Sequence, residues 1–313
     1  MTSEGDHCMR TRILITVVAV FAMLGLSMPA QAIVNGEADN GEHPFVGELL
    51  FYVPDAVDSR FTDPGSWYTC TGTLVSPTVV VTAGHCSYGI GEDGKPTTGA
   101  DGNDVWINFS EVPDFSSFPP SADYIPDRNE QRYLDRKAAL NADPNWLEAT
   151  AYTHPEYNDA AFYLHDLGVL VLDDPLKSDT YGQVPDEGLL NRLEKRKSKI
   201  IFEAVGYGLE GSKLNSSFGG DTRRKAQQRL VNLKGVGGAG GGISAKFSSN
   251  RGTNTSGGTC FGDSGGPIFR GDTSTLVAVT SYGISPTCSD GTGGYRLDQA
   301  DDLDFLATFG VTP

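Results

Sequence analysis

Three short segments carry the residue types needed for nucleophilic catalysis by a serine hydroxyl. His85 follows an apolar run, Asp166 enters the apolar segment 167–172, and Ser264 lies in the glycine-rich run 262–267. A serine hydroxyl is a weak nucleophile until a neighbouring imidazole accepts its proton. That imidazole in turn needs a carboxylate to fix its tautomer and stabilise its charge. The segments supply these groups in the order His, Asp, Ser.

Each of these residues has a structural alternative. His85 could be a polar residue whose hydrogen bonds are satisfied at a strand end, and Asp166 could begin a turn. A flexible linker does not explain Ser264, because its run lies among a cysteine, a proline and the apolar strand predicted at 267–269. We interpret His165, the neighbour of Asp166, as a packing or surface residue.

The segments that must position these groups are short and rich in β-forming residues. Runs of Val, Ile, Thr and Tyr between Gly, Pro, Asn and Asp predict strands without alternating helices, which favours barrels or a sandwich. The predicted strands span residues 45–53, 72–83, 104–108, 167–172, 199–205, 267–269 and 276–282. One helix is predicted at 298–309, where Leu303, Leu306 and Phe309 recur at helical spacing.

Three stretches are predicted to be loops. Residues 89–103 are rich in Gly, Asp and Thr, but their carboxylates do not have EF-hand spacing, so we interpret them as solvated turns and leave a calcium site open. Residues 110–145 look like an insertion, partly helical around 128–140, whose role in recruiting a partner stays open. Residues 235–242 are nearly all Gly and lack the following Gly-Lys-Ser/Thr, which indicates a flexible loop and not a phosphate cradle.

The composition limits the class of protein and its partners. The chain has 313 residues, of which 38% are hydrophobic and 39 are Gly, as in a turn-rich globular protein with one large β domain or two small ones. Its formal net charge is −16. An acidic surface repels nucleic acid and anionic lipid, so we expect neither as a partner. We expect a monomer.

Residues 1–32 have the features of a secretory signal peptide. Arg10 and Arg12 precede an apolar run at 13–28, and a small-x-small pattern ends at Ala32. The run is shorter than the roughly 20 residues that span a membrane. We therefore expect a secreted protein without a membrane anchor. Acidic residues before Met9 are unusual in such a segment, and Met9 is an alternative start.

Cleavage after Ala32 leaves four cysteines, an even set that predicts two disulfides in an exported chain. From the residues alone three pairings are open. The cysteines are Cys70, Cys86, Cys260 and Cys288. There is no Cys-x-x-Cys motif and the histidines lack metal-ligand spacing, so no metal or cofactor is predicted.

Segments 82–86, 165–170 and 262–267 together resemble the His, Asp and Ser boxes of chymotrypsin/trypsin-like serine peptidases. The resemblance covers nearly all of residues 33–309. It implies an all-β fold of two antiparallel six-stranded β-barrels, with the active site in the cleft between them. The implied N-terminal barrel spans about 45–172, the C-terminal barrel about 173–297 and the C-terminal helix about 298–309, within a peptidase domain of residues 33–313.

The resemblance implies hydrolysis of peptide bonds in proteins or peptides through an acyl-enzyme. His85 is then the general base, Asp166 orients it and Ser264 is the nucleophile. A catalytically silent binding homologue is one alternative, although no triad residue is missing. A serine esterase on the same fold is another, because it shares the acyl-enzyme chemistry.

The same resemblance assigns supporting roles. The amides of Gly262 and Ser264 are expected to form an oxyanion hole. Two disulfides are expected, Cys70–Cys86 holding the histidine loop and Cys260–Cys288 tying the serine loop to the pocket wall.

The resemblance also implies that activation requires a free N-terminus at Ile33, whose α-ammonium would pair with Asp263. Because the predicted signal cut falls directly before Ile33, signal cleavage alone would release it, and we hypothesise that there is no zymogen stage. An ordinary buried strand start at Ile33 is the alternative.

The expected primary pocket has no fixed carboxylate where trypsins carry an aspartate, six residues before Ser264. The residues that the resemblance assigns to substrate binding are Gly258, Thr259, Ser281, Gly283 and Gly293. A pocket of this kind favours large apolar or aromatic side chains. Asp290 leaves a preference for Arg or Lys open.

Overall fold

The structure of the chain is a computed structural model that describes residues 33–56, 64–90, 104–120, 129–213, 216–238, 241–249, 257–289 and 291–313. The predicted signal peptide, nearly all of the loop predicted at 89–103, and Asp290 lie outside these residues.

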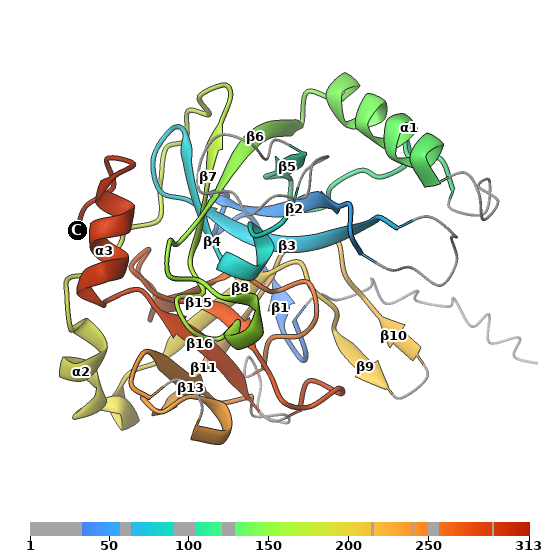
Figure 1. Ribbon diagram of the computed structural model, residues 1–313. Coiled ribbons are helices and arrows are strands. Elements are labelled where there is room, and N and C mark those ends of the chain that lie inside the picture. Colours follow the sequence, from blue (N-terminus) through green and yellow to red (C-terminus); the bar gives the residue numbers. More distant parts are fainter. Residues whose placement is uncertain are drawn as a thin grey trace, which may run out of the picture.

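The N-terminal half forms a closed six-stranded barrel, as expected (Figure 1). Its strands follow the order β2-β3-β4-β7-β6-β5. They are β2 (Val46–Val53), β3 (Ser66–Leu74), β4 (Val79–Thr82), β5 (Val105–Asn108), β6 (Trp146–Thr153) and β7 (Gly168–Leu172). Valine and leucine side chains from several of these strands fill the interior.

The C-terminal half forms an eight-stranded antiparallel sheet and not the closed six-stranded barrel that was expected. The sheet order is β1-β11-β8-β14-β15-β16-β13-β12. Its strands are β1 (Glu37–Ala38), β8 (Phe202–Gly206), β11 (Arg224–Gln228), β12 (Leu230–Asn232), β13 (Ser244–Phe247), β14 (Pro267–Arg270), β15 (Leu276–Tyr282) and β16 (Thr292–Arg296).

The sheet curls because β11 and β12, which lie at or near its opposite edges, are separated along the chain only by Arg229. The N-terminal strand β1 pairs with β11 and so adds an outer edge strand. Strands β9 (Gly211–Lys213) and β10 (Ser216–Phe218) form a separate hairpin.

The described residues form three α-helices outside the sheets: α1 (Asn129–Ala142), α2 (Leu189–Glu194) and α3 (Ala300–Ala307). Helices α1 and α2 lie at opposite corners of the molecule (Figure 1). Helix α3 joins the two halves, because Phe309 just beyond it packs on Tyr152 of β6, and Tyr295 of β16 donates a 2.8 Å hydrogen bond to Asp302. Within the described part of the chain, no helix is long and apolar enough to cross a membrane.

The prediction of one strand over 72–83 is wrong at its centre. Residues 72–74 end β3, the chain turns at 75–78, and β4 begins at Val79. The amide of Val79 donates to Ser76 Oγ in this turn. Pro77 also lies there and cannot donate a backbone hydrogen bond, which accounts for the break.

Candidate active site

The pairing of β4 with β7 brings His85 and Asp166 together. Thr82 at the end of β4 lies opposite Gly168 at the start of β7, so the segments just beyond both strand ends meet. The contact is close: a Cβ added to Gly168 would lie 2.5 Å from Ser87 Oγ. His85 occupies the short 3₁₀ helix η1 (Gly84–Cys86) that follows β4.

Asp166 is fully buried and holds the histidine loop through both the backbone and the side chain of His85. Its Oδ1 accepts a 2.9 Å hydrogen bond from the His85 amide, and both carboxylate oxygens lie 3.0 Å from His85 Nδ1. This contact fixes the ring so that Nε2 is the nitrogen left for proton transfer.

The charge on Asp166 also sets the basicity of His85. Burial of the imidazole opposes its protonation. The negative charge of Asp166, its hydrogen bond and the charge of Asp159 outweigh burial and raise the pKa of His85 above 6.5. The ring is thus a stronger proton acceptor than a free histidine.

Ser281, which was expected only to bind substrate, is a further hydrogen-bond donor to Asp166. Ser281 Oγ donates a 2.5 Å hydrogen bond to Asp166 Oδ2. Ser281 lies in β15, 115 positions from Asp166 along the chain. No local sequence signal marks this contact, because it depends on how the two halves of the molecule pack.

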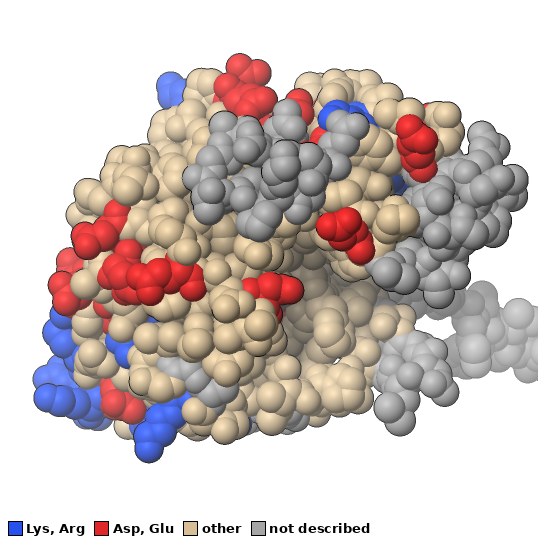
Figure 2. Space-filling model, viewed as in Figure 1, with Lys and Arg blue, Asp and Glu red and all other residues tan. Residues whose placement is uncertain are grey.

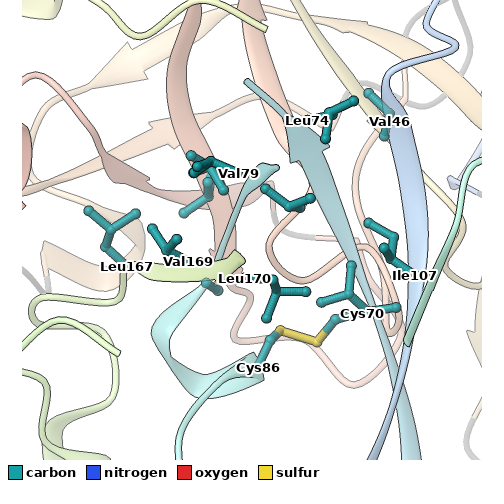
Figure 3. Packing of buried hydrophobic residues seen from close by; sticks show 14 of the residues in the cluster. Val46, Cys70, Leu74, Val79, Cys86, Ile107, Leu167, Val169 and Leu170 are labelled. Atoms are coloured by element: carbon teal, nitrogen blue, oxygen red, sulfur yellow. A yellow bond between two sulfur atoms is a disulfide. The ribbon is translucent and has the colours of Figure 1, made fainter. Parts of the chain in front are cut away.

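The disulfide between Cys70 and Cys86 holds the histidine loop on β3 (Figure 3). The two Cα atoms are 6.3 Å apart. Figure 3 shows the bridge beside buried side chains of the first barrel, among them Leu170 and Ile107. The second disulfide, Cys260–Cys288, joins the serine loop to the segment after β15.

The serine loop is anchored to both halves of the molecule. The carbonyl of Ser264 accepts a 2.7 Å hydrogen bond from the amide of Thr71 in β3, and the amide of Gly265 donates to Thr280 in β15 at 2.7 Å. Gly265 has a φ of 76°, and a Cβ there would lie 2.0 Å from Thr82 Oγ1. Only glycine fits this approach of the loop to the end of β4.

Ser264 and His85 line the same hollow. Among the described residues, the Ser264 hydroxyl has no hydrogen-bond partner, so the proton-transfer contact to His85 is not formed in this structure. Contacts of this kind often shorten only when substrate binds. The amides of Gly262 and Ser264 likewise donate to no described residue, which leaves both free to bind an oxyanion.

Asp263 is fully buried behind Ser264. Its carboxylate accepts hydrogen bonds of 2.8 Å from the amides of Gly208 and Cys260. Burial outweighs these two bonds and raises the pKa of Asp263 to about 7. A buried carboxylate without a cationic partner is costly, and a cation placed beside it would stabilise its charged form.

The segment that begins at Ile33 docks close to the serine loop. Val34 exchanges two backbone hydrogen bonds with Gly258, of 2.9 and 3.1 Å, and the Ile33 side chain is fully buried in the second hydrophobic cluster. The docking therefore fixes the position of Ile33 within the molecule.

A smaller pocket of about 220 Å³ opens beside Ser264. Of the predicted substrate-binding residues, Thr259, Ser281 and Gly283 line it. Gly258 and Gly293 are not among its described lining residues; Gly258 pairs with Val34, and a Cβ on Gly293 would meet the Tyr282 ring. Cys260 and Cys288, whose disulfide was expected at the pocket wall, also line it, as does Tyr282. Further lining residues that the sequence did not indicate are Phe162, Phe261, Thr280, Ser285 and Gly291.

Two clusters of potential metal ligands occur in the described chain, and neither is arranged for a metal. In the first, Cys70 and Cys86 are bonded to each other beside His85 and offer no thiolate. In the second, His154 and His165 stack at an interplanar angle of 15°, so their nitrogen lone pairs do not converge. His154 Nδ1 also accepts a hydrogen bond from a backbone amide.

Comparison with known proteins agrees with this geometry. The family model described as Trypsin matches residues 37–115 and 141–297, and the unmatched residues between them lie inside the predicted insertion. A solved structure titled HL collagenase is similar in fold, with a TM-score of 0.58 and 17% sequence identity; the match covers 90% of this chain and 100% of that chain. No curated protein matches the chain in sequence. Because the family model matches more than half of its residues, the chain belongs to the trypsin family.

Proposed function

We propose that the chain is a serine endopeptidase with Ser264 as nucleophile, His85 as general base and Asp166 as the residue that orients it. The observation that carries this proposal is the 3.0 Å contact between His85 Nδ1 and Asp166, at the edge of the hollow that His85 and Ser264 share. Family membership supports the reaction class.

In the proposed mechanism His85 Nε2 accepts the proton of the Ser264 hydroxyl as Oγ attacks the carbonyl carbon of the peptide. The amides of Gly262 and Ser264 stabilise the oxyanion, and each donor of this kind contributes roughly 3 kcal/mol. His85 then donates the proton to the leaving amine as the C–N bond breaks. Water, deprotonated by His85, hydrolyses the acyl-enzyme and restores the serine.

The proposed primary specificity is for large apolar or aromatic side chains. The described residues that line the 220 Å³ pocket include no Lys, Arg, Asp or Glu, and they include the aromatic rings of Phe162, Phe261 and Tyr282. A cation would be desolvated there without a partner. Asp290, which left a basic preference open, lies outside the described residues.

We also propose secretion, and activation by the signal cut itself. Cleavage before Ile33 would create an α-ammonium in the segment that Val34 docks on Gly258. Pairing of that ammonium with Asp263 would compensate the buried carboxylate. Mass-spectrometric sequencing of the secreted protein tests this proposal: we expect Ile33 at the N-terminus of active protein, and activity that appears only after a second cut would contradict it.

Digestion of casein, with cleavage sites mapped by mass spectrometry, tests the function. We expect cuts mainly after Phe, Tyr, Leu or Met, and no cuts with the Ser264→Ala variant. Ester hydrolysis without any peptide cleavage would identify an esterase, and absence of both activities would indicate a binding homologue.

A further inference from the structure

The hollow beside the catalytic residues is lined by carboxylates. It encloses about 830 Å³ next to Ser264 and His85, and Asp55, Asp159 and Asp221 lie in its wall. The lining residues that the structure describes include no Lys or Arg. Figure 2 shows a recess with acidic side chains at its border, while most Lys and Arg side chains on this face gather at the lower left.

None of these three carboxylates forms an ion pair with a described Lys or Arg. All three side chains belong to exposed residues. The buried carboxylate of Asp39, by contrast, has a cationic partner, because Arg223 Nε lies 2.8 Å from its Oδ2. The hollow therefore keeps a negative potential that its own described residues do not cancel.

An aromatic ring in the same wall adds a second feature that suits a cation. Tyr68 is 46% exposed and packs on Phe51, with ring centroids 6.2 Å apart, and both residues line the hollow. An exposed aromatic face attracts a guanidinium or ammonium group, and arginine is the more common partner. Carboxylates combined with an aromatic face point to a basic side chain as the occupant.

The position of His85 indicates which part of the substrate enters this hollow. The separate 220 Å³ pocket, which also includes Ser264, is the proposed primary pocket and would hold the side chain of the residue before the scissile bond. His85 lines only the larger hollow, and it must reach the leaving amine to protonate it. The larger hollow therefore accepts the residues that follow the scissile bond.

We propose that this hollow selects peptides with arginine or lysine among the first three residues after the scissile bond. The proposal rests on the proposed peptidase function and adds a substrate class to it. Asp55 and Asp221 attract the basic side chain, and Tyr68 stacks on it. Asp159 contributes charge in the same hollow and also acts on His85, so it is left unchanged in the test.

The test uses peptides with one acyl-side sequence and Arg, Ala or Glu as the second residue after the scissile bond. For the native protein we expect kcat/KM for the Arg peptide to exceed that for the Glu peptide about fivefold at low salt, and the ratio to fall at high salt. The Asp55→Asn/Asp221→Asn variant should bring the ratio close to one. Asp272→Asn, on an exposed turn outside both hollows, is the matched control and should keep it.

Binding separates this proposal from the function on which it rests. Fluorescence anisotropy of the labelled peptides is measured with Ser264→Ala, alone and combined with Asp55→Asn/Asp221→Asn. Stronger binding of the Arg peptide, if it is lost when Asp55 and Asp221 are both substituted, supports the proposed selectivity. This holds even if the native protein cleaves none of the peptides. Such a lack of cleavage would contradict the peptidase function but not the selectivity of the hollow. Equal binding of all three peptides, or a preference that the Asp substitutions do not change, overturns the proposal.

Discussion

The hydroxyl of Ser281 donates a 2.5 Å hydrogen bond to Asp166 Oδ2, while the other side of the same carboxylate holds His85. Asp166 is fully buried, so each of these donors stabilises its charge in a medium that screens little. The orientation of the His85 imidazole therefore depends on both halves of the molecule, because His85 follows β4 and Ser281 lies in β15.

Removal of this hydroxyl should impair the chemical step more than substrate binding. We expect Ser281→Ala to lower kcat roughly tenfold, because a hydrogen bond to a charged group contributes about 1.5 kcal/mol or more. Steady-state kinetics on a peptide amide, with thermal unfolding to show that the fold is retained, provide the measurement. A raised KM with an unchanged kcat would show that Ser281 only contacts substrate.

The pH dependence of activity should follow the protonation of His85. Its pKa is raised above 6.5, and only the neutral ring accepts a proton, so kcat/KM should rise as pH increases through that pKa. Asp159→Asn removes one of the charges that raise this pKa, and we expect the midpoint of the pH profile to move toward acid. A midpoint that moves toward alkali, or does not move, would contradict this assignment of charge.

Position 208 lies so close to the serine loop that it should not accept any residue larger than glycine. A Cβ at Gly208 would lie 2.4 Å from the amide nitrogen of Asp263 and 2.6 Å from the carbonyl oxygen of Phe261. We expect Gly208→Ala to destabilise the protein by roughly 2 kcal/mol and to reduce kcat, because the serine loop would be displaced. Urea unfolding and kinetics measure the two effects.

Gly41 offers the control for that substitution, because no described residue other than its two chain neighbours has an atom within 4 Å of a Cβ added there. The positive φ of 74° at Gly41 disfavours alanine, so Gly41→Ala should destabilise the protein by about 1 kcal/mol. Activity should be kept. Equal losses of activity in both variants would mean that crowding at the serine loop is not the cause.

A buried ion network near the N-terminal segment should make stability depend on pH. His43 Nδ1 lies 2.5 Å from Asp39, its Nε2 lies 3.3 Å from Glu203, and its ring stacks on Phe269. Burial lowers the pKa of His43, but the bonds to both carboxylates outweigh burial and raise the pKa to about 8. Since the folded pKa exceeds the unfolded value of 6.5, the stabilisation is full below about pH 6.5 and is lost as pH rises through about 8.

The difference between native protein and His43→Gln isolates this effect from other titrating groups. The free energy of unfolding should differ between them by about 2 kcal/mol more at pH 6 than at pH 9, as the rise from 6.5 to about 8 implies. Urea titrations at the two pH values provide the data. A difference that does not change with pH would show that His43 contributes through packing alone.

The parts of the site that depend on local residue order were predictable from the sequence. The glycines around Ser264, the apolar strand that precedes His85 and the apolar strand that follows Asp166 have local signals. Both strands lie within the predicted segments, as β4 and β7. The contact of Ser281 with Asp166 has no local sequence signal, because the two residues are 115 positions apart. The same limit applies to the hollow, whose carboxylates come from three separate segments.

The fold was predictable to a similar extent. Strands β2, β4, β5 and β7 of the first barrel have high β propensity and lie within predicted strands, but β6, which pairs with β5 and β7 and closes the barrel, was not predicted. Strand β11 has the sequence Arg-Lys-Ala-Gln-Gln, which does not favour a strand, and it forms because all five residues pair with β8. Its cations also find partners, Arg224 at the carbonyl of Gly36 and Lys225 at Glu42. These contacts join segments far apart in the chain, so the sequence of β11 by itself does not predict a strand.

Active-site labelling tests whether His85 and Asp166 activate the Ser264 hydroxyl. Diisopropyl fluorophosphate, which reacts with activated serines, is applied to the purified protein and the modified residue is located by mass spectrometry. We expect one phosphorylated serine, Ser264, and at least a hundredfold slower labelling in His85→Ala and Asp166→Asn. An unlabelled Ser264, or labelling at the same rate in both variants, would contradict the account.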